Sequence, residues 1–473
     1  MVSNVEPEEL AAAIKHLSEW AEQHAPQPQS PVRIRLRAHF GCDPAELPVV
    51  LRPLEAWDRP NLQVAIDAWL AGKEVEVVGV SVMDGYRAGL AELVRGGDWA
   101  AHVELGGIDH MTVPLGGQES ITCVEAGLWL VRDGEQPLVV MLTATDRGMG
   151  DRLGLEVMAP ERERAETVLA ELRRLMAEHN VYRGRVLELA SRHFHEDEGA
   201  PLTVRSLPVV ARERIVLADG VLETIERQAM GYARHAERLL ASGRHLRRGL
   251  LLHGPPGVGK TLTAMYLATR MPERTVVLLT GQSLGTVGAS VDLATALQPA
   301  MVILEDVDLV ATNRTFRPEN PILFELLNAM DGLSEDHDVL FVLTTNRADL
   351  LEPALASRPG RVDQAVELAL PDASGRRRLI ELYGEGLGLS LGPGEQLVEA
   401  LEGTSPAFIR ELLRRAALVA AEESDDGPLR VTEDHLHAAL AELRRGGDEL
   451  TQTLLGARAP EHLGEELEGL EDM

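Results

Sequence analysis

Short apolar runs that end in polar or glycine-rich residues recur through the second half of the chain. Four of them occupy residues 250–252, 275–279, 301–304 and 340–343. Runs of this length, rich in Leu, Val and Ile, are typical of strands that are buried on both faces. The residues from 262 to 270 favour a helix. The pattern therefore predicts four buried strands, with a helix after the first of them.

The first half of the chain mixes helical and strand periodicities. Apolar residues recur at helical spacing in some stretches and alternate with polar residues in others. The predicted elements are helices over 5–24 and 160–179, strands over 32–37 and 74–80, and a hairpin whose strands, 128–131 and 138–142, flank Asp133-Gly134. This mixture predicts an α+β domain over residues 1–196. No catalytic constellation is visible in it, so by elimination we expect an adaptor or regulatory domain.

Polar segments separate and follow the predicted domains. Residues 197–207 are polar and contain Gly and Pro, which is typical of a linker. A helix is predicted over 221–241, with apolar positions suited to packing beside the domain that follows. The stretch 446–473 is acidic, and its residues 461–473 include no Lys or Arg. We expect this tail to be disordered or loosely docked.

Charge and cysteine usage narrow the class of partner. The 473 residues carry a formal net charge of −29, which disfavours a nucleic-acid backbone or an anionic membrane surface as the partner. The first residues lack the basic region and apolar core of a signal peptide, and no apolar run approaches the ~18 residues needed to cross a bilayer. Cys42 and Cys123 have no metal-ligand spacing. We therefore expect a cytoplasmic protein without a membrane partner.

The predicted strand, loop and helix at 250–270 carry a phosphate-binding motif of the form G-x-x-x-x-G-K-[ST]. Glycines let several backbone N–H groups point at phosphate oxygens, and the helix N-terminus adds its positive dipole end. We expect Lys260 to reach the β- and γ-phosphates of ATP and Thr261 to ligate Mg²⁺. The predicted nucleotide-binding residues are Gly254, Pro255, Pro256, Gly257, Val258, Gly259, Lys260, Thr261 and Leu262.

Later strands deliver further polar residues at their ends. The run at 301–304 leads into acidic residues, a Walker-B-like pattern in which a strand brings carboxylates to Mg²⁺ and to the attacking water. The run at 340–343 leads to an asparagine whose amide can hydrogen-bond the γ-phosphate or that water. Two arginines then follow on a Pro-Gly turn. The expected catalytic residues are Glu305, Asp306, Asn346, Arg358 and Arg361.

In this order and spacing, the motifs resemble the AAA subfamily of P-loop ATPases. Residues 254–261 look like its Walker A motif, 344–347 resemble its sensor 1, and 352–361 are similar to its second region of homology. The resemblance covers about residues 208–445. Residues 1–196 match no family that their sequence allows us to name.

This resemblance implies an α/β fold, with a doubly wound parallel sheet over 208–372 and a small helical lid over 373–445. It also implies a homo-oligomeric ring, usually a hexamer. Arg358 and Arg361 would then act in trans, as arginine fingers on the γ-phosphate of the neighbouring subunit. Such a finger can contribute about 10³–10⁵ in rate.

The chain departs from the family pattern at two functional places. The usual Asp-Glu of Walker B is reversed to Glu305-Asp306, as in the branch that contains the mitochondrial Rieske-protein translocase, which itself has a transmembrane helix. By position Glu305 takes the Mg²⁺ role and Asp306 activates water, with Asp308 as the alternative to Asp306. The loop at 281–290, where the family usually carries an aromatic residue that grips substrate, has none. This absence weakens the interpretation as a processive unfoldase.

Together these features predict a Mg²⁺-dependent ATPase ring that remodels a protein partner selected by residues 1–196. A nucleotide-gated switch or scaffold with slow turnover is the alternative, motivated by the reversed acids and the loop without an aromatic residue. A nucleic-acid motor is a third hypothesis, which the net charge disfavours.

Overall fold

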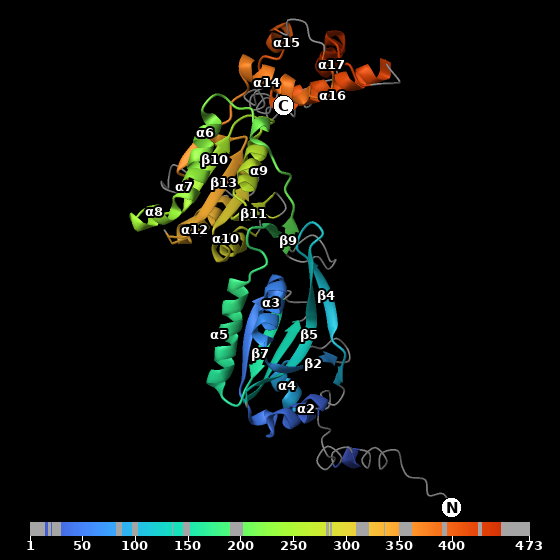
Figure 1. The fold of residues 1–473 in the computed structure, drawn as a ribbon, viewed down its shortest axis with the longest axis vertical. Coiled ribbons are helices and arrows are strands. Elements are labelled where there is room, and N and C mark those ends of the chain that lie inside the picture. The colour runs from blue at the N-terminus through green and yellow to red at the C-terminus, as the bar shows by residue number, and fades with distance from the viewer. Residues whose placement is uncertain are drawn as a thin grey trace, which may run out of the picture. The chain divides into compact units, whose positions relative to one another are not determined.

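The computed structural model describes residues 15–17, 20, 30–81, 88–96, 103–134, 136–144, 152–189, 202–280, 283, 286–308, 321–334, 336–349, 362–389, 395–423 and 428–445. The chain divides into two compact units, Met1–Val181 and Tyr182–Met473. In Figure 1 the first unit runs from blue to green and the second from green to red. Most of the helix predicted over 5–24, and the whole acidic tail at 446–473, lie outside the described residues.

The first unit is built on one seven-stranded antiparallel sheet. The strand order is β1-β7-β6-β5-β2-β3, and β4 pairs with β5. The strands are β1 (Val49–Glu55), β2 (Glu74–Ser81), β3 (Glu104–Gly106), β4 (Asp109–Pro114), β5 (Ser120–Asp133), β6 (Gln136–Ala144) and β7 (Arg152–Met158). The predicted hairpin is confirmed, since Asp133 of β5 lies opposite Gln136 of β6. The strand predicted over 74–80 is confirmed as β2.

Helices cover both faces of this sheet. They are α2 (Pro31–Phe40), α3 (Arg59–Leu70), α4 (Leu90–Arg95) and α5 (Arg162–Glu178), with short 3₁₀ turns at Pro44–Glu46 and Ala56–Asp58. Successive residues of β5 point to opposite faces. Leu128 and Leu130 are therefore buried with α2 and α4, whereas Trp129 and Val131 are buried with α3 and α5. The helix predicted over 160–179 is confirmed as α5.

The strand predicted over 32–37 is wrong, because these residues belong to helix α2. Arginines at alternate positions imitate the pattern of a half-exposed strand. However, Val32 and Leu36, four residues apart, are fully buried, while Ile34 between them is 56% exposed. Pro31 at the start and Gly41, with a φ of 75°, at the end are typical helix boundaries. These residues form a helix because the helical arrangement places the apolar side chains of Val32 and Leu36 on one face, which packs against the sheet.

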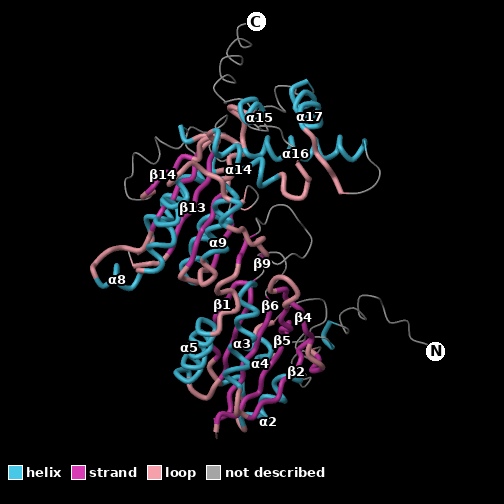
Figure 2. Tube along the Cα trace, turned by 45° about the horizontal axis from the view of Figure 1, so that its top comes forward, coloured by secondary structure: helices cyan, strands magenta, loops and turns pink. Residues whose placement is uncertain are grey.

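The second unit contains a sheet with the order β14-β10-β13-β12-β11-β8-β9. Every neighbouring pair is parallel except β8 and β9. The strands are β8 (Val186–Leu189), β9 (Leu202–Arg205), β10 (Arg248–His253), β11 (Thr275–Leu279), β12 (Ala300–Leu304), β13 (Val339–Thr345) and β14 (Gln364–Glu367). All residues of β12 and β13 are buried, as expected for a parallel sheet covered on both faces. The α/β fold with a parallel sheet is thus confirmed (Figure 2).

The helices around this sheet are α6 (Val221–Glu226), a π-helical turn (Arg227–Gly231), α7 (Tyr232–Arg234), α8 (Ala236–Ala241), α9 (Lys260–Arg270), α10 (Val287–Ala296) and α12 (Pro321–Gly332). The helix predicted over 221–241 is therefore present but broken. The predicted helix over 262–270 is confirmed as part of α9.

The division between the units differs from the predicted linker at 197–207. The first unit ends at Val181, and β8 and β9 both belong to the sheet of the second unit. The predicted linker at 197–207 overlaps β9, in which apolar and polar residues alternate over only four positions. The connection into the second unit is therefore made by β8, which pairs with β11.

Four helices form a lid with a core of its own. They are α14 (Ala373–Tyr383), α15 (Glu395–Ala400), α16 (Pro406–Glu423) and α17 (Glu433–Arg445). The lid core and the sheet core meet in adjacent residues, since Val216 is buried in the first and Ile215 in the second. Among the described residues, no helix combines the length and apolar character required to cross a membrane.

The helical assignment of α2 leads to a prediction that a strand would not share. We expect Leu36→Ala to lower the free energy of unfolding by about 2–5 kcal/mol, because it empties a fully buried site. Ile34→Ala is the matched control and should change it by less than about 0.5 kcal/mol, since Ile34 is exposed. Urea denaturation of the full chain measures both. Equal losses would contradict the helix, because a strand places Ile34 and Leu36 on one face.

Candidate nucleotide-binding site

The loop between β10 and α9 has a backbone shape that only glycine accommodates. Gly254, Gly257 and Gly259 have φ values of 145°, 79° and 100°. A Cβ on Gly254 would lie 2.2 Å from the carbonyl oxygen of Leu368. All three glycines are therefore required for their conformation, and Gly254 is required for close packing as well.

Lys260 begins α9, and its ammonium is enclosed by the loop. Its side chain is buried, and Nζ donates hydrogen bonds to the carbonyl oxygens of Gly254 and Pro255, both at 2.8 Å. It also donates to Oδ1 of Asn346 at 2.7 Å. Burial lowers the pKa of Lys260 to about 8, against the opposing influence of the Asp306 and Asp308 carboxylates.

Asn346 comes from the neighbouring strand, β13, and joins two parts of the site. Its Oδ1 accepts from Lys260, and its Nδ2 donates to Oδ1 of Asp306 at 3.4 Å. Strands β10 and β13 are parallel and adjacent, with His253 opposite Thr345, so their carboxyl ends lie side by side. The structure thus brings together three residues that the sequence predicted from separate motifs.

Glu305 follows the next strand, β12, beside the phosphate loop. The Thr261 side chain lies beside the Glu305 carboxylate. Burial, followed by the Asp306 charge, raises the pKa of Glu305. Its Oε1 is buried without a hydrogen-bond partner. An unpartnered carboxylate oxygen next to a hydroxyl is a donor set that suits Mg²⁺, which prefers oxygen ligands and commonly takes only one or two from the protein. The residues present therefore fit the ion.

Asp306 is held in an unusual backbone conformation. Its φ of 49° is the one positive value at a non-glycine position within the described part of the chain. Its N–H donates to the buried hydroxyl of Thr344 at 3.0 Å. Burial, followed by the Asp308 charge, raises the pKa of Asp306, whereas Lys260 and Asn346 oppose this shift. A strained residue whose carboxylate lies beside Lys260 and Asn346 is typical of a catalytic position.

Asp308 has a different environment from Asp306. Its Oδ1 accepts from the Thr345 hydroxyl at 2.9 Å and from the backbone N–H of Asn346 at 3.1 Å. The side chain is only 7% exposed. Asp308 therefore fastens the end of β13, and with it Asn346, to the segment after β12.

The other predicted site residues either pack around the loop or lie outside the described residues. Val258 is buried in the sheet core, and Leu262 packs against that core. Gly257 accepts a hydrogen bond from the Ala407 N–H at 3.2 Å, which brings the start of α16 to the loop. Arg358 and Arg361 lie outside the described residues. Thr344 and Thr345 lie in the motif that resembles sensor 1, but the sequence predicted no role for them, and the structure shows that their buried hydroxyls hold the two aspartates.

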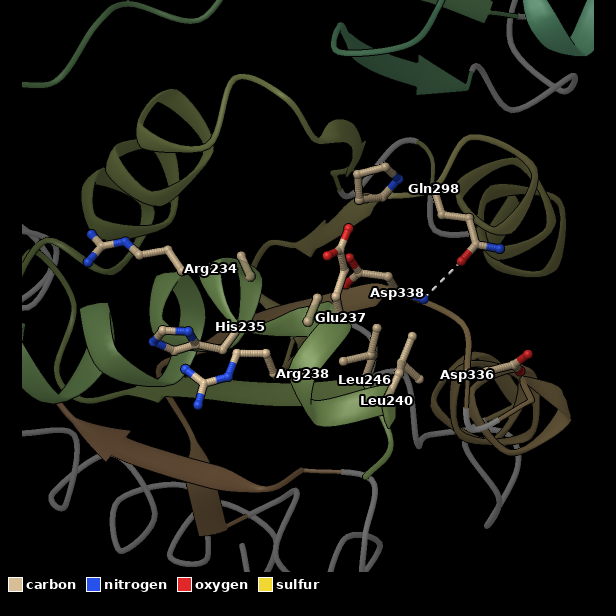
Figure 3. Close-up of a pocket in the computed structure, with 12 residues that line it drawn as sticks. Arg234, His235, Glu237, Arg238, Leu240, Leu246, Gln298, Asp336 and Asp338 are labelled. Atoms are coloured by element: carbon tan, nitrogen blue, oxygen red, sulfur yellow. Dashed lines mark hydrogen bonds between the residues drawn. The ribbon is translucent and has the colours of Figure 1, made fainter. Parts of the chain in front are cut away.

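Two hollows in the second unit are lined by different elements. One of about 760 Å³ is lined by α7, α8 and the residues before β12 and β13, including Pro299 and Asp338 (Figure 3). It therefore lies at the amino ends of the parallel strands, opposite the loop. The other, a cleft of about 560 Å³, is lined by residues 212–223 and by α14. The residues of this cleft come from the segment before the sheet and from the first helix of the lid.

The parallel sheet, the glycine loop and the acids at neighbouring strand ends define a P-loop nucleoside-triphosphate-binding protein. The ATPase family associated with various cellular activities (AAA) matches residues 250–370. The second unit therefore contains an AAA ATPase domain.

Similar proteins match this part of the chain. An ATP-dependent zinc metalloprotease FtsH 2 of Sphaerobacter thermophilus is 31% identical over 46% of this chain and 36% of its own length. A cell division cycle protein 48 homolog of Archaeoglobus fulgidus is 29% identical over 46% of this chain and 31% of its own. A proteasome-activating nucleotidase of Methanothermobacter thermautotrophicus is 30% identical over 38% of this chain and 47% of its own. The chain thus spans less than half the length of each of these relatives.

The lowered pKa of Lys260 predicts a pH dependence of nucleotide affinity. Below about pH 8 the ammonium is charged and attracts phosphate, and above it the free site loses that charge, so affinity for ATP should fall by up to about tenfold per pH unit. Titration of fluorescent ATP with EDTA present, from about pH 7 to about pH 9.5, measures this without a metal contribution.

The control for this measurement is Lys260→Arg, whose guanidinium stays charged over the whole range. It should bind more weakly, with a flat profile. A flat profile for the unmodified chain would show that the buried ammonium does not titrate there.

Proposed function

We propose that this chain is a Mg²⁺-dependent ATPase whose catalytic centre lies at the carboxyl ends of β10, β12 and β13. The observation that carries the proposal is the chain of contacts from Lys260 through Asn346 to Asp306. It links the residue suited to the γ-phosphate with the carboxylate suited to the attacking water. The matching AAA domain and the relatives named as ATP-dependent support it.

Nucleotide binding would rearrange the contacts of Lys260. In the structure, Nζ of Lys260 donates hydrogen bonds to two carbonyl oxygens of the loop and to Asn346. Phosphate oxygens, which carry negative charge, are stronger acceptors for an ammonium than these neutral groups. Lys260 would then turn from the carbonyls to the β- and γ-phosphates, while Thr261 and Glu305 would hold Mg²⁺. The bound ion would neutralise charge that develops on the phosphate oxygens.

Hydrolysis requires a base close to the attacking water. Asp306 would accept the proton of that water as its oxygen attacks the γ-phosphorus, and ADP would leave with the bridging oxygen. Asn346, released from Lys260, would orient the water through its amide. Asp308 is unsuited to this role, because its Oδ1 already holds Thr345 and the Asn346 backbone.

The choice between Asp306 and Asp308 can be tested with isosteric variants. We expect Asp306→Asn to lower kcat for ATP by at least about 100-fold while retaining ATP binding, because the amide cannot accept the proton. Asp308→Asn keeps an oxygen that can accept both existing bonds and should lose no more than about tenfold. Steady-state phosphate release and ATP titration measure the two effects.

A larger loss of kcat in Asp308→Asn than in Asp306→Asn would assign the role of base to Asp308. Binding of ATP without measurable turnover in the unmodified chain would instead favour the nucleotide-gated switch, for which the shorter Asp306 carboxylate is the supporting observation.

We further propose that the chain assembles into a homo-oligomeric ring, taken as a hexamer, in which Arg358 and Arg361 complete the neighbouring site. The relatives whose names include a metalloprotease and a proteasome-activating nucleotidase support action on a protein partner. The first unit, which lies outside the AAA match, would select that partner in the cytoplasm. Sedimentation with ATP tests the ring, and a chain that stays monomeric while hydrolysing ATP would contradict it.

A further inference from the structure

The segment that enters the second unit is hydrogen-bonded to β11 from Thr275 to Leu278. At the start of β11, the Gly184 N–H donates to the Thr275 hydroxyl at 3.1 Å, and the Val276 N–H donates to the Arg185 carbonyl at 2.9 Å. Strand β8 then pairs with β11 in parallel, with Glu188 opposite Leu278. A displacement of this connecting segment would therefore strain its hydrogen bonds to β11 directly.

Glu188 lies at the far end of this pairing and is held from two sides. Its Oε2 accepts from Nε of Arg205 on β9 at 2.7 Å, and its Oε1 accepts from the Thr280 hydroxyl at 3.0 Å. The Glu188 side chain is 15% exposed, against 56% for Arg205. A carboxylate with both oxygens engaged and little solvent around it has a fixed orientation, and its bonds are stronger than neutral ones.

Thr280 begins a chain of hydrogen bonds through the loop that follows β11. Its N–H donates to the hydroxyl of Ser283 at 2.8 Å, and that hydroxyl donates to the Thr280 carbonyl at 3.1 Å. The Thr286 hydroxyl donates to the Ser283 carbonyl at 2.7 Å, one residue before α10 begins. Ser283 is only 1% exposed. Glu188 is thus connected to the start of α10 by a continuous set of side-chain and backbone bonds.

The same end of β11 also supports the acid that follows β12. The Glu305 N–H donates to the Leu279 carbonyl at 3.1 Å. Leu279, which holds Glu305, is therefore the direct neighbour in sequence of Thr280, which holds Glu188. Glu188 is one of the charges acting on the Glu305 carboxylate. The position of Glu188 therefore affects both Thr280 and the carboxyl edge of the sheet, where ATP would react.

We propose that Glu188 is a positioning residue, which couples the segment joining the two units to Thr280, Ser283 and Thr286 and to the reactive edge of the sheet. Through this residue, partner binding at the first unit would alter turnover without touching the nucleotide. The kinetic part of the inference rests on the proposed ATPase function, whereas the hydrogen bonds of Thr280, Ser283 and Thr286 do not depend on hydrolysis.

The test uses Glu188→Gln in the full chain, which keeps the shape of the side chain and removes its charge. Amide hydrogen exchange within 280–286 should become about three- to tenfold faster, while exchange within 250–261 stays unchanged. In phosphate-release assays kcat should fall by about three- to tenfold, with KM for ATP unchanged. Adding Thr280→Val to this variant should cause little further loss, because both changes break the same link.

Glu273→Gln is the matched control, at the opposite end of β11. Glu273 is exposed, and its side chain makes no bond within the described part of the chain. It should leave both readouts unchanged. Unchanged exchange at 280–286 in Glu188→Gln, or an equal change in the control, would overturn the inference. If exchange responds but the unmodified chain has no turnover, the ATPase proposal fails while the positioning role stands.

Discussion

A buried ammonium at the carboxyl edge of a parallel sheet is the constraint on which the second unit depends. A charge removed from water must be surrounded by acceptors, and Lys260 obtains three from the protein. Two are carbonyls of the loop itself, which can turn inward only because Gly254, Gly257 and Gly259 adopt positive φ values. The third comes from Asn346. The loop conformation and the placing of β13 next to β10 are thus both tied to this one side chain.

The order of the strands then determines which chemistry surrounds the ammonium. Because β13 and β12 follow β10 across the sheet, their ends bring first Asn346 and then Glu305 and Asp306 to the same edge. Buried threonine hydroxyls and Asp308 hold these residues in place, including Asp306 in a conformation that costs about 1–3 kcal/mol elsewhere in proteins. The lid contributes from the other side, since the Ala407 N–H bonds the loop at Gly257. The site is therefore assembled from distant segments by one topology.

Prediction from the sequence was most reliable where a few neighbouring residues by themselves determine the backbone conformation or the burial of a segment. The glycine loop and the apolar runs at 275–279 and 301–304 specify backbone conformation and burial within a few residues, and the structure confirms them. The strand expected at 32–37 was wrong, because alternating arginines and the helical pair Val32 and Leu36 fit two periods at once, and only the sheet to be covered decides between them. The boundary near 197–207 was misplaced for a similar reason, since β8 and β9 are stabilised by pairing across the sheet. Glu188 has no local signal, because its contacts are with residues of other strands and loops.

In the proposed mechanism, Asn346 connects the phosphate-binding lysine to the residue that activates water. Steady-state phosphate release by Asn346→Ala, measured together with ATP affinity, tests it most directly. We expect kcat to fall by at least about tenfold with ATP binding retained, because Lys260 loses only a competing acceptor while the water loses its orienting amide. An unchanged kcat would contradict this role, since Asp306 would then activate the water without the amide that is proposed to orient it.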